Sequence, residues 1–339
     1  MSKVIVPYQE NWELSKEEKH LLPAKILKHM YDYDVVVLHN ARRSTYGVVN
    51  NRHRNILVWN FWQMLGGYLA DEDADMITTT VKPLSFFYAR TSGDANASSC
   101  YITFGTDTTP PSFSDYVLQS RDTTLEGSVL EPSFVVESDR IRIRFRRQAL
   151  GTVYEIGLYQ KVYNDIGRVY EVMHGRAVVQ NGLTGNVYYD IVLKEPFLEN
   201  LARVIYGYLT DTDQNIIDVL GQVRTVKTSG ELNFMEARLA IGSGSDPFSF
   251  SQYKLTNMYE LTWDTKFEYG ERTDTLIFLA DGTRFETDYN INEIGIIQPL
   301  YDTDGFPAFA LLMRYLMPSP IQKKAGEKFY ALVAIYASI

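Results

Sequence analysis

The chain has 339 residues, of which 45% are hydrophobic and 22% are charged, a balance typical of a globular protein with room for two domains. Its net charge of −9 argues against general binding to nucleic acid, because such binding depends on clustered Lys and Arg that neutralise phosphates. The single cysteine, Cys100, excludes an intramolecular disulfide and any multi-cysteine zinc site.

The first 52 residues form an expected N-terminal arm. The segment 1–10 lacks the apolar core of a secretory signal peptide, and no apolar run is long enough to span a bilayer, so we expect no membrane span. The arm carries Trp12, Tyr31 and Tyr33, followed by Val-Val-Val-Leu at residues 35–38. Apolar side chains are stabilised when they leave water, so we expect the arm to be held by the body of the protein or by a neighbouring molecule.

Two later segments of the chain match at nearly one spacing. GTDTTPPSFSDYVL at 105–118 and GSGSDPFSFSQYKL at 242–255 share seven of fourteen positions without a gap, where average residue usage gives about one. Further matches at spacings of 138 to 141 are Glu155-Ile156-Gly157 with Glu293-Ile294-Gly295, Arg176 with Arg314, residues 188–192 with 329–333, and residues 67–71 with 207–211. These matches predict a tandem duplication of domain size, with copy one at 53–195 and copy two at 196–339.

Each copy is expected to open with a helix. Apolar residues recur there at helical spacing: Leu57, Phe61, Leu65, Tyr68 and Leu69 in copy one, and Leu198, Leu201, Ile205, Tyr208 and Leu209 in copy two. Pro196 stands where a first-turn proline is tolerated. Such a stripe indicates a helix face packed on a sheet, and the alternative is a helix that binds a partner.

A strand follows in copy one, where residues 140–146 alternate between arginine and apolar side chains. The alternation predicts that the Ile and Phe side chains face inward and that Arg140, Arg142, Arg144 and Arg146 line the other face. Three interpretations of this face stay open: a salt-bridged contact with another subunit, a solvated surface, or contact with nucleic acid. We favour the first, and take these arginines with Trp12, Tyr31 and Tyr33 of the arm as candidate subunit-interface residues.

Short β-rich runs separated by Gly, Asn and Asp continue through both copies, for example at residues 153–159, 176–179 and 329–336. This pattern predicts a mainly β fold. We expect two tandem jelly-roll-like antiparallel β-sandwich domains from a duplication, each preceded by a helix, plus the N-terminal arm.

Motifs that would indicate catalysis, a cofactor or a metal are absent from the sequence. It has no phosphate-binding loop, no zinc-protease helix and no nucleophile elbow. The histidines His20, His29, His39 and His53 lack helical metal-site spacing, and the acidic runs at 71–75, 211–213 and 302–305 match no helix-flanked calcium loop. We therefore expect no catalysis, no cofactor and no bound metal.

Three stretches of the two copies resemble parts of a recurring module of tailed-phage and archaeal-virus structural proteins. They are Gly-Thr-Asp-Thr-Thr-Pro-Pro at 105–111 with Glu-Ile-Gly-Leu-Tyr at 155–159 in copy one, and Arg314 with Pro-Ser-Pro at 318–320 in copy two. In that module a helix is followed by a strand ending in a G-T-G-T-T-P-P-like loop, and a later strand carries E-x-G-L-Y. The resemblance implies a non-catalytic building block of the particle surface or tail.

The first hypothesis is therefore a viral structural protein of a capsid, vertex turret or tail appendage, found in the virion after assembly in the host cytoplasm. Its expected partners are copies of itself and other virion proteins. A carbohydrate-binding or host-receptor adhesin module is the alternative, in which exposed aromatic side chains would stack on a host glycan. A third hypothesis, a glycan-cleaving enzyme, would use a carboxylate pair such as Glu155 and Glu171.

Overall fold

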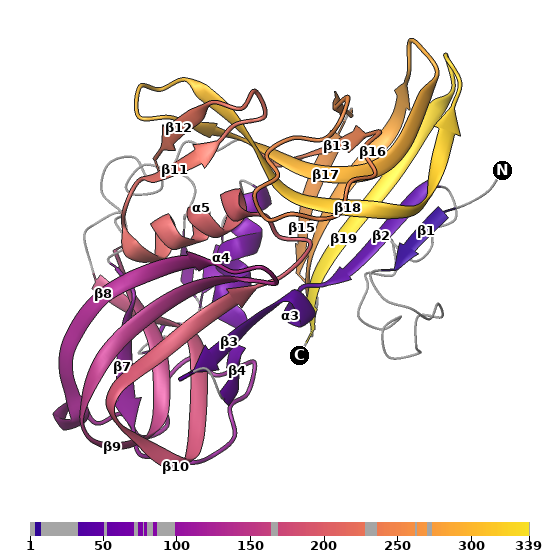
Figure 1. The fold of residues 1–339 in the computed structure, drawn as a ribbon. Helices are drawn as coiled ribbons and strands as arrows, with labels where there is room; N and C mark the ends of the chain where they lie inside the picture. Colours follow the sequence, from indigo (N-terminus) through magenta and orange to yellow (C-terminus); the bar gives the residue numbers. More distant parts are fainter. Residues whose placement is uncertain are drawn as a thin grey trace.

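The computed structural model describes residues 4–7, 33–50, 53–70, 74–76, 78–79, 84–86, 99–163, 169–227, 236–261, 263–269 and 273–338. Within these residues the protein is mainly β, as the sequence predicts, with two 12-residue helices between its sheets (Figure 1). Trp12 and Tyr31, two of the predicted interface residues, lie outside the described residues, as do His20 and His29.

Copy one is built around one curled sheet. Its strands are β3 (Thr45–Val49), β4 (His53–Leu57), β7 (Tyr101–Gly105), β8 (Glu126–Val136), β9 (Ile141–Tyr163) and β10 (Val169–Leu193). The strand order is β3-β4-β10-β9-β7, and β8 pairs with the first half of β9. The long antiparallel pair β9 and β10 curls into the half-barrel at the lower left of Figure 1. A 3-10 turn (Thr123–Leu125) precedes β8, and a small hairpin joins β5 (Ala74–Met76) to β6 (Leu84–Phe86).

Copy two has two larger sheets instead of one. Its strands are β11 (Gln214–Ile217), β12 (Val223–Val226), β13 (Arg238–Gly242), β14 (Tyr259–Glu260), β15 (Trp263–Tyr269), β16 (Thr273–Arg284), β17 (Tyr289–Tyr301), β18 (Pro307–Lys323) and β19 (Lys328–Ser338). One sheet has the order β14-β13-β17-β18, the other has the order β1-β2-β19-β16-β15, and β11 pairs with β12. The two sheets agree with the predicted β-sandwich class.

Strands that are continuous in copy one are interrupted in copy two. Residues 285–288 separate β16 from β17, and residues 324–327 separate β18 from β19. The Asp288 carboxylate accepts hydrogen bonds from the backbone N–H of Ala325 (3.0 Å) and from Lys324 Nζ (2.7 Å), while Gly326 N–H donates to the Phe285 carbonyl (2.8 Å). Gly326 has φ of 81°, a left-handed conformation that suits glycine. These contacts join the two interruptions, so the hairpin divides between two sheets.

Part of the predicted arm belongs to the sheets of the body. The arm supplies β1 (Val4–Pro7), β2 (Val35–Asn40) and the short helix α3 (Ala41–Ser44), which leads into β3. β2 lies parallel to β19 of copy two, whereas β3 lies antiparallel to β10 of copy one. Val35, Val36 and Val37 are at most 1% exposed, and Tyr33 packs on the neighbouring apolar cluster. Residues 33–50 are therefore held by the body, and they connect both copies.

Both helices lie between the copies (Figure 1). α4 (Trp59–Ala70) contacts β10 of copy one and also β15 and β16 of copy two, while α5 (Glu199–Thr210) contacts β18 of its own copy and also β8 and β9. A helix packed on one sheet would bury one face, but every residue of α4 after Trp59 is buried. The sequence predicts one buried face on this helix, whereas the structure buries all its faces, because α4 packs against both copies. Its lack of charged residues is the sequence feature that indicates burial all round.

His39 links the arm to copy two at a fully buried position. Its Nδ1 lies 2.9 Å from the Tyr315 hydroxyl on β18, and its Nε2 lies 2.7 Å from the Ser44 hydroxyl on α3. In copy one, His174 is also buried, with its Nε2 2.9 Å from Gln160 Oε1. Burial lowers the pKa of each imidazole from its ordinary 6.5 to about 3. Both histidines are therefore neutral in the folded protein at neutral pH.

This gives a prediction for the pH dependence of stability. Because the folded pKa lies below the unfolded pKa, protonation favours the unfolded chain, so stability is lost as pH falls below about 6.5. At pH 5 each histidine should lower the free energy of unfolding by about 2 kcal/mol relative to pH 7. Urea unfolding at the two pH values checks this for the wild type and for His39→Gln and His174→Gln. Each variant should lose less stability between pH 7 and pH 5, and an unchanged loss in both variants would contradict the assignment.

Candidate functional site

A buried arginine anchors the loop that follows β7. Arg176, on β10, is 1% exposed, and its Nε donates to Glu155 Oε1 at 2.7 Å. Its Nη1 donates to Asp115 Oδ2 at 2.9 Å, and its Nη2 donates to Asp107 Oδ2 at 3.0 Å. Asp107 and Asp115 both belong to the loop, so one guanidinium group holds the loop at two points.

Glu155 on β9 holds the same loop from the other side. Its carboxylate is fully buried and accepts hydrogen bonds from the backbone N–H groups of Gln119 (2.7 Å) and Ser120 (3.0 Å). Gly105, at the start of the loop, leaves room for this contact, because a Cβ there would lie 2.5 Å from Glu155 Oε2 and from the Ser120 carbonyl. A residue with a side chain at position 105 would therefore displace the Glu155 carboxylate from the loop.

Copy two repeats this arrangement at the matched positions. Arg314 is 1% exposed, its Nε donates to Glu293 Oε2 at 2.5 Å, and its Nη1 donates to Gln252 Oε1 at 2.9 Å. Glu293 Oε1 accepts the backbone N–H groups of Gly244 (3.1 Å) and Thr256 (2.8 Å). A Cβ on Gly242 would lie 2.4 Å from Glu293 Oε1, the same restriction as at Gly105.

The two loops differ in charge. Three carboxylates surround Arg176, whereas Arg314 has one carboxylate, the Gln252 amide and the Asp246 carbonyl at 3.0 Å. Copy one thus has a carboxylate at two loop positions, Asp107 and Asp115, where copy two has the uncharged residues Gly244 and Gln252. The N–H of Thr109, together with the charge of Arg176, lowers the pKa of Asp107, so its carboxylate stays ionised.

Sequence reasoning found these loops but missed what anchors them. The sequence identifies Arg176 and Arg314 as matched positions of the two copies but gives neither a structural role, and it assigns nothing to Asp107 and Asp115, which pair with Arg176. The available signal was a pair of charged positions, Glu and Arg, that both copies keep at a spacing of 138 between apolar neighbours such as Ile156, Ala177 and Val178. A charge in such a strand must be paired when it is buried.

The predicted arginine face of β9 has its ion partners within the same chain. Asp190 on β10 is 1% exposed and pairs with Arg142 (3.3 Å) and Arg144 (2.7 Å). Arg146 donates to the backbone carbonyl of Glu131, and Arg140 pairs with Asp139 at 2.9 Å. Ile141, Ile143 and Phe145 are buried, so the predicted alternation is confirmed. A role for the four arginines in subunit contact stays a prediction.

The remaining polar candidates have separate partners. Glu171 accepts hydrogen bonds from the Tyr101 hydroxyl and from Arg121 Nη1 (2.9 Å), whereas the Glu155 carboxylate is occupied by Arg176 and the loop N–H groups. Within the described residues, no group of three or more His, Cys, Asp or Glu side chains is placed to hold a metal ion. In the same part of the chain, no helix is long and apolar enough to cross a membrane.

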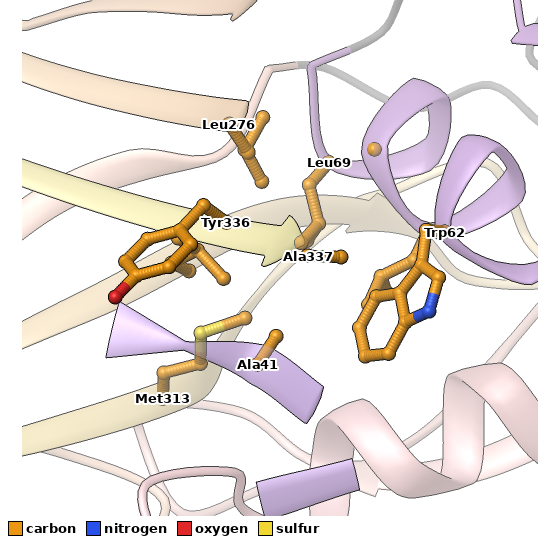
Figure 2. A pocket seen from close by; sticks show the side chains of 10 residues that line it. Ala41, Trp62, Leu69, Leu276, Met313, Tyr336 and Ala337 are labelled. Atoms are coloured by element: carbon orange, nitrogen blue, oxygen red, sulfur yellow. The ribbon is translucent and has the colours of Figure 1, made fainter. Parts of the chain in front are cut away.

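One pocket lies beside α4, where the helix faces copy two (Figure 2). Its walls are apolar and include Trp62 and Leu69 of α4, Met313 of β18 and Tyr336 of β19. Its volume is about 20 Å³, which is room for about one water-sized molecule. It is too small for a cofactor or a sugar ring.

The chain does not match any protein-family model, curated protein or solved structure in comparisons with known proteins. The contacts within the two arginine-anchored loops are therefore what indicates their role. Every charged group that faces the buried arginines is used to hold a loop in place.

Removing one arginine tests this interpretation. Arg176→Met leaves Glu155 buried without its ion partner and should lower the free energy of unfolding by about 3–5 kcal/mol. The double variant with Glu155→Gln should recover part of this loss. Arg314→Met and its double variant with Glu293→Gln are the matched pair, and recovery should be more complete there because no other carboxylate faces that guanidinium. Urea unfolding of both cycles measures the coupling, and losses that simply add in each double variant would contradict the paired role.

Proposed function

We propose that this chain is a structural protein that self-assembles into part of a virus particle, as a capsid, vertex turret or tail component, and that it works without catalysis. The observation that carries the proposal is the role of the motif residues. Residues 105–111 and 155–159 resemble a virion module, and in this protein Gly105, Glu155 and the loop 105–120 form one hydrogen-bonded unit around the buried Glu155 carboxylate. Arg314, Glu293 and Gly242 form the same unit in copy two. Because these residues hold the loops in place, they favour a structural role over a catalytic one.

A surface suited to self-assembly lies on β8. This strand pairs with β9 and carries four apolar side chains that are well exposed, namely Val129 (55%), Leu130 (37%), Val135 (45%) and Val136 (41%). Exposed apolar residues on an outer strand are a common basis for strand pairing between molecules. The arginines of β9 lie next to this strand, and their exposed parts can add polar contacts around it.

The test of the proposed function is assembly of the purified protein. Sedimentation over a range of concentrations, with imaging of the particles by electron microscopy, should show a closed ring or a lattice. The variant Val129→Lys/Val135→Lys should weaken assembly by at least about tenfold, because lysine charges would be buried at the contact. Leu220→Lys, at a 77% exposed position on the β11–β12 turn, is the matched control. A monodisperse monomer at high concentration would contradict the proposal.

A glycan-binding function is the second candidate, and one observation favours it. Tyr116 and Tyr253 occupy matched positions in the two loops, as expected for paired stacking platforms. They are not equivalent, because Tyr116 is 44% exposed whereas Tyr253 is half-buried and packs beside Gly221 and Lys254. Only the first loop therefore offers an open aromatic face.

A glycan array with the intact protein tests this candidate. If sugars are bound, Tyr116→Ala should remove most of the signal, and Tyr253→Ala should change it less because the Tyr253 ring is partly covered. An equal loss in both variants would point to disturbed loops rather than to stacking, and no binding by the wild type would contradict the candidate.

A further inference from the structure

The helices α4 and α5 each end against the other copy. The backbone N–H of Ala237 in copy two donates to the carbonyl of Leu69 in α4 (3.0 Å), and the N–H of Cys100 in copy one donates to the carbonyl of Leu209 in α5 (2.7 Å). The last carbonyls of a helix have no partner within the helix. Here each helix receives its partner from the opposite copy.

Two buried glutamines make the same kind of hydrogen bond, each from one copy to the helix of the other. Gln298 Nε2 of copy two donates to the carbonyl of Tyr68 at 3.0 Å, and Gln160 Nε2 of copy one donates to the carbonyl of Tyr208 at 3.2 Å. Both glutamines are fully buried. The two contacts join matched residues, because the glutamines are 138 positions apart and the tyrosines are 140 apart. The contact between the copies is thus reciprocal.

The beginnings of the helices stay with their own copies. Val58 N–H donates to the carbonyl of His174, and Leu198 N–H donates to the carbonyl of Leu312, both at 2.9 Å. Asn60 and Asn200 reinforce this, since their side-chain amides donate to the carbonyls of Met173 and Leu311. Each helix therefore starts on its own sheet and ends on the other.

Apolar packing across the contact is continuous. One core cluster contains side chains of both copies, including Phe61 and Leu69 of α4, Leu201 of α5, and Phe278 and Ile335 of copy two. The pocket in Figure 2 lies in this contact, between α4 and strands of copy two. The connection at residues 194–198 is also tied down, because Lys194 N–H donates to the Ser44 carbonyl (2.7 Å).

We propose that the two copies form an internal dimer, in which each copy is the binding partner of the other through its helix. Reciprocal contacts between matched residues are the mark of a twofold, self-complementary interface. It follows that the copies open and unfold together as one unit rather than as two independent tandem domains. The apolar face that each helix turns away from its own sheet is thus covered by the other copy, which is present in the same chain.

The single cysteine provides a probe in the full-length protein. Cys100 is 5% exposed, and burial raises the pKa of its thiol, so the folded protein should react slowly with a thiol reagent such as DTNB. Ile156 and Ile294 are the matched fully buried residues of the two copies, and both are replaced conservatively by valine. In urea just below the unfolding transition, Ile156→Val and Ile294→Val should each speed the labelling of Cys100, by roughly two- to tenfold.

The deciding result is the effect of a change in copy two on a thiol in copy one. Faster labelling in Ile294→Val supports one cooperative unit, whereas an effect confined to Ile156→Val overturns it. If neither variant changes the rate of Cys100 labelling, the number of unfolding transitions of the wild type decides whether the copies form one unit. Urea unfolding of the wild type, followed by circular dichroism and by Cys100 exposure, should give one coincident transition, and two separate transitions would overturn the internal dimer.

Discussion

The central constraint in this structure is that a buried guanidinium group must have all its donors and its charge satisfied. Arg176 and Arg314 stand on buried stretches of β10 and β18, and each is matched by a buried glutamate on the neighbouring strand. The pair alone leaves donors on the arginine and acceptors on the carboxylate, so a loop must close over it. The shapes of both loops, the glycines at their starts and the register of the strand pairs all follow from this requirement.

Much of this could be predicted from the sequence where the signal was local or repeated. The alternation at 140–146 gave the correct buried face, and the spacing of 137 to 141 placed the loops, helices and charged strand positions in register. Contacts between distant segments had no such signal. Asp190 is 46 residues from Arg144, and nothing in the intervening sequence pairs them. The extra burial of α4 was visible only as the lack of charge in 59–70. The incorporation of residues 33–50 into the sheets depends on β10, about 140 residues away, and on β19, 296 residues away.

The copies also show which parts of the repeat tolerate change. The Glu–Arg pair, the loop glycine and the helix contacts occur in both, whereas the carboxylates around the arginine and the continuity of the long hairpin differ. A single curled sheet and a divided one can therefore carry the same loop. This separation supports the proposed scaffold function, because surfaces outside the shared unit can vary without disturbing what holds each copy together.

The exchange of helix ends has a consequence for how the protein is made. Ala237, which satisfies the end of α4, follows Leu69 by 168 residues, so it leaves the ribosome roughly 10–30 s later. During synthesis, copy one therefore carries an apolar helix whose final surface does not yet exist. Contacts of such long sequence separation also slow folding. The nascent chain must keep this helix from other apolar surfaces, including those of neighbouring nascent chains, which could supply the second repeat in place of its own.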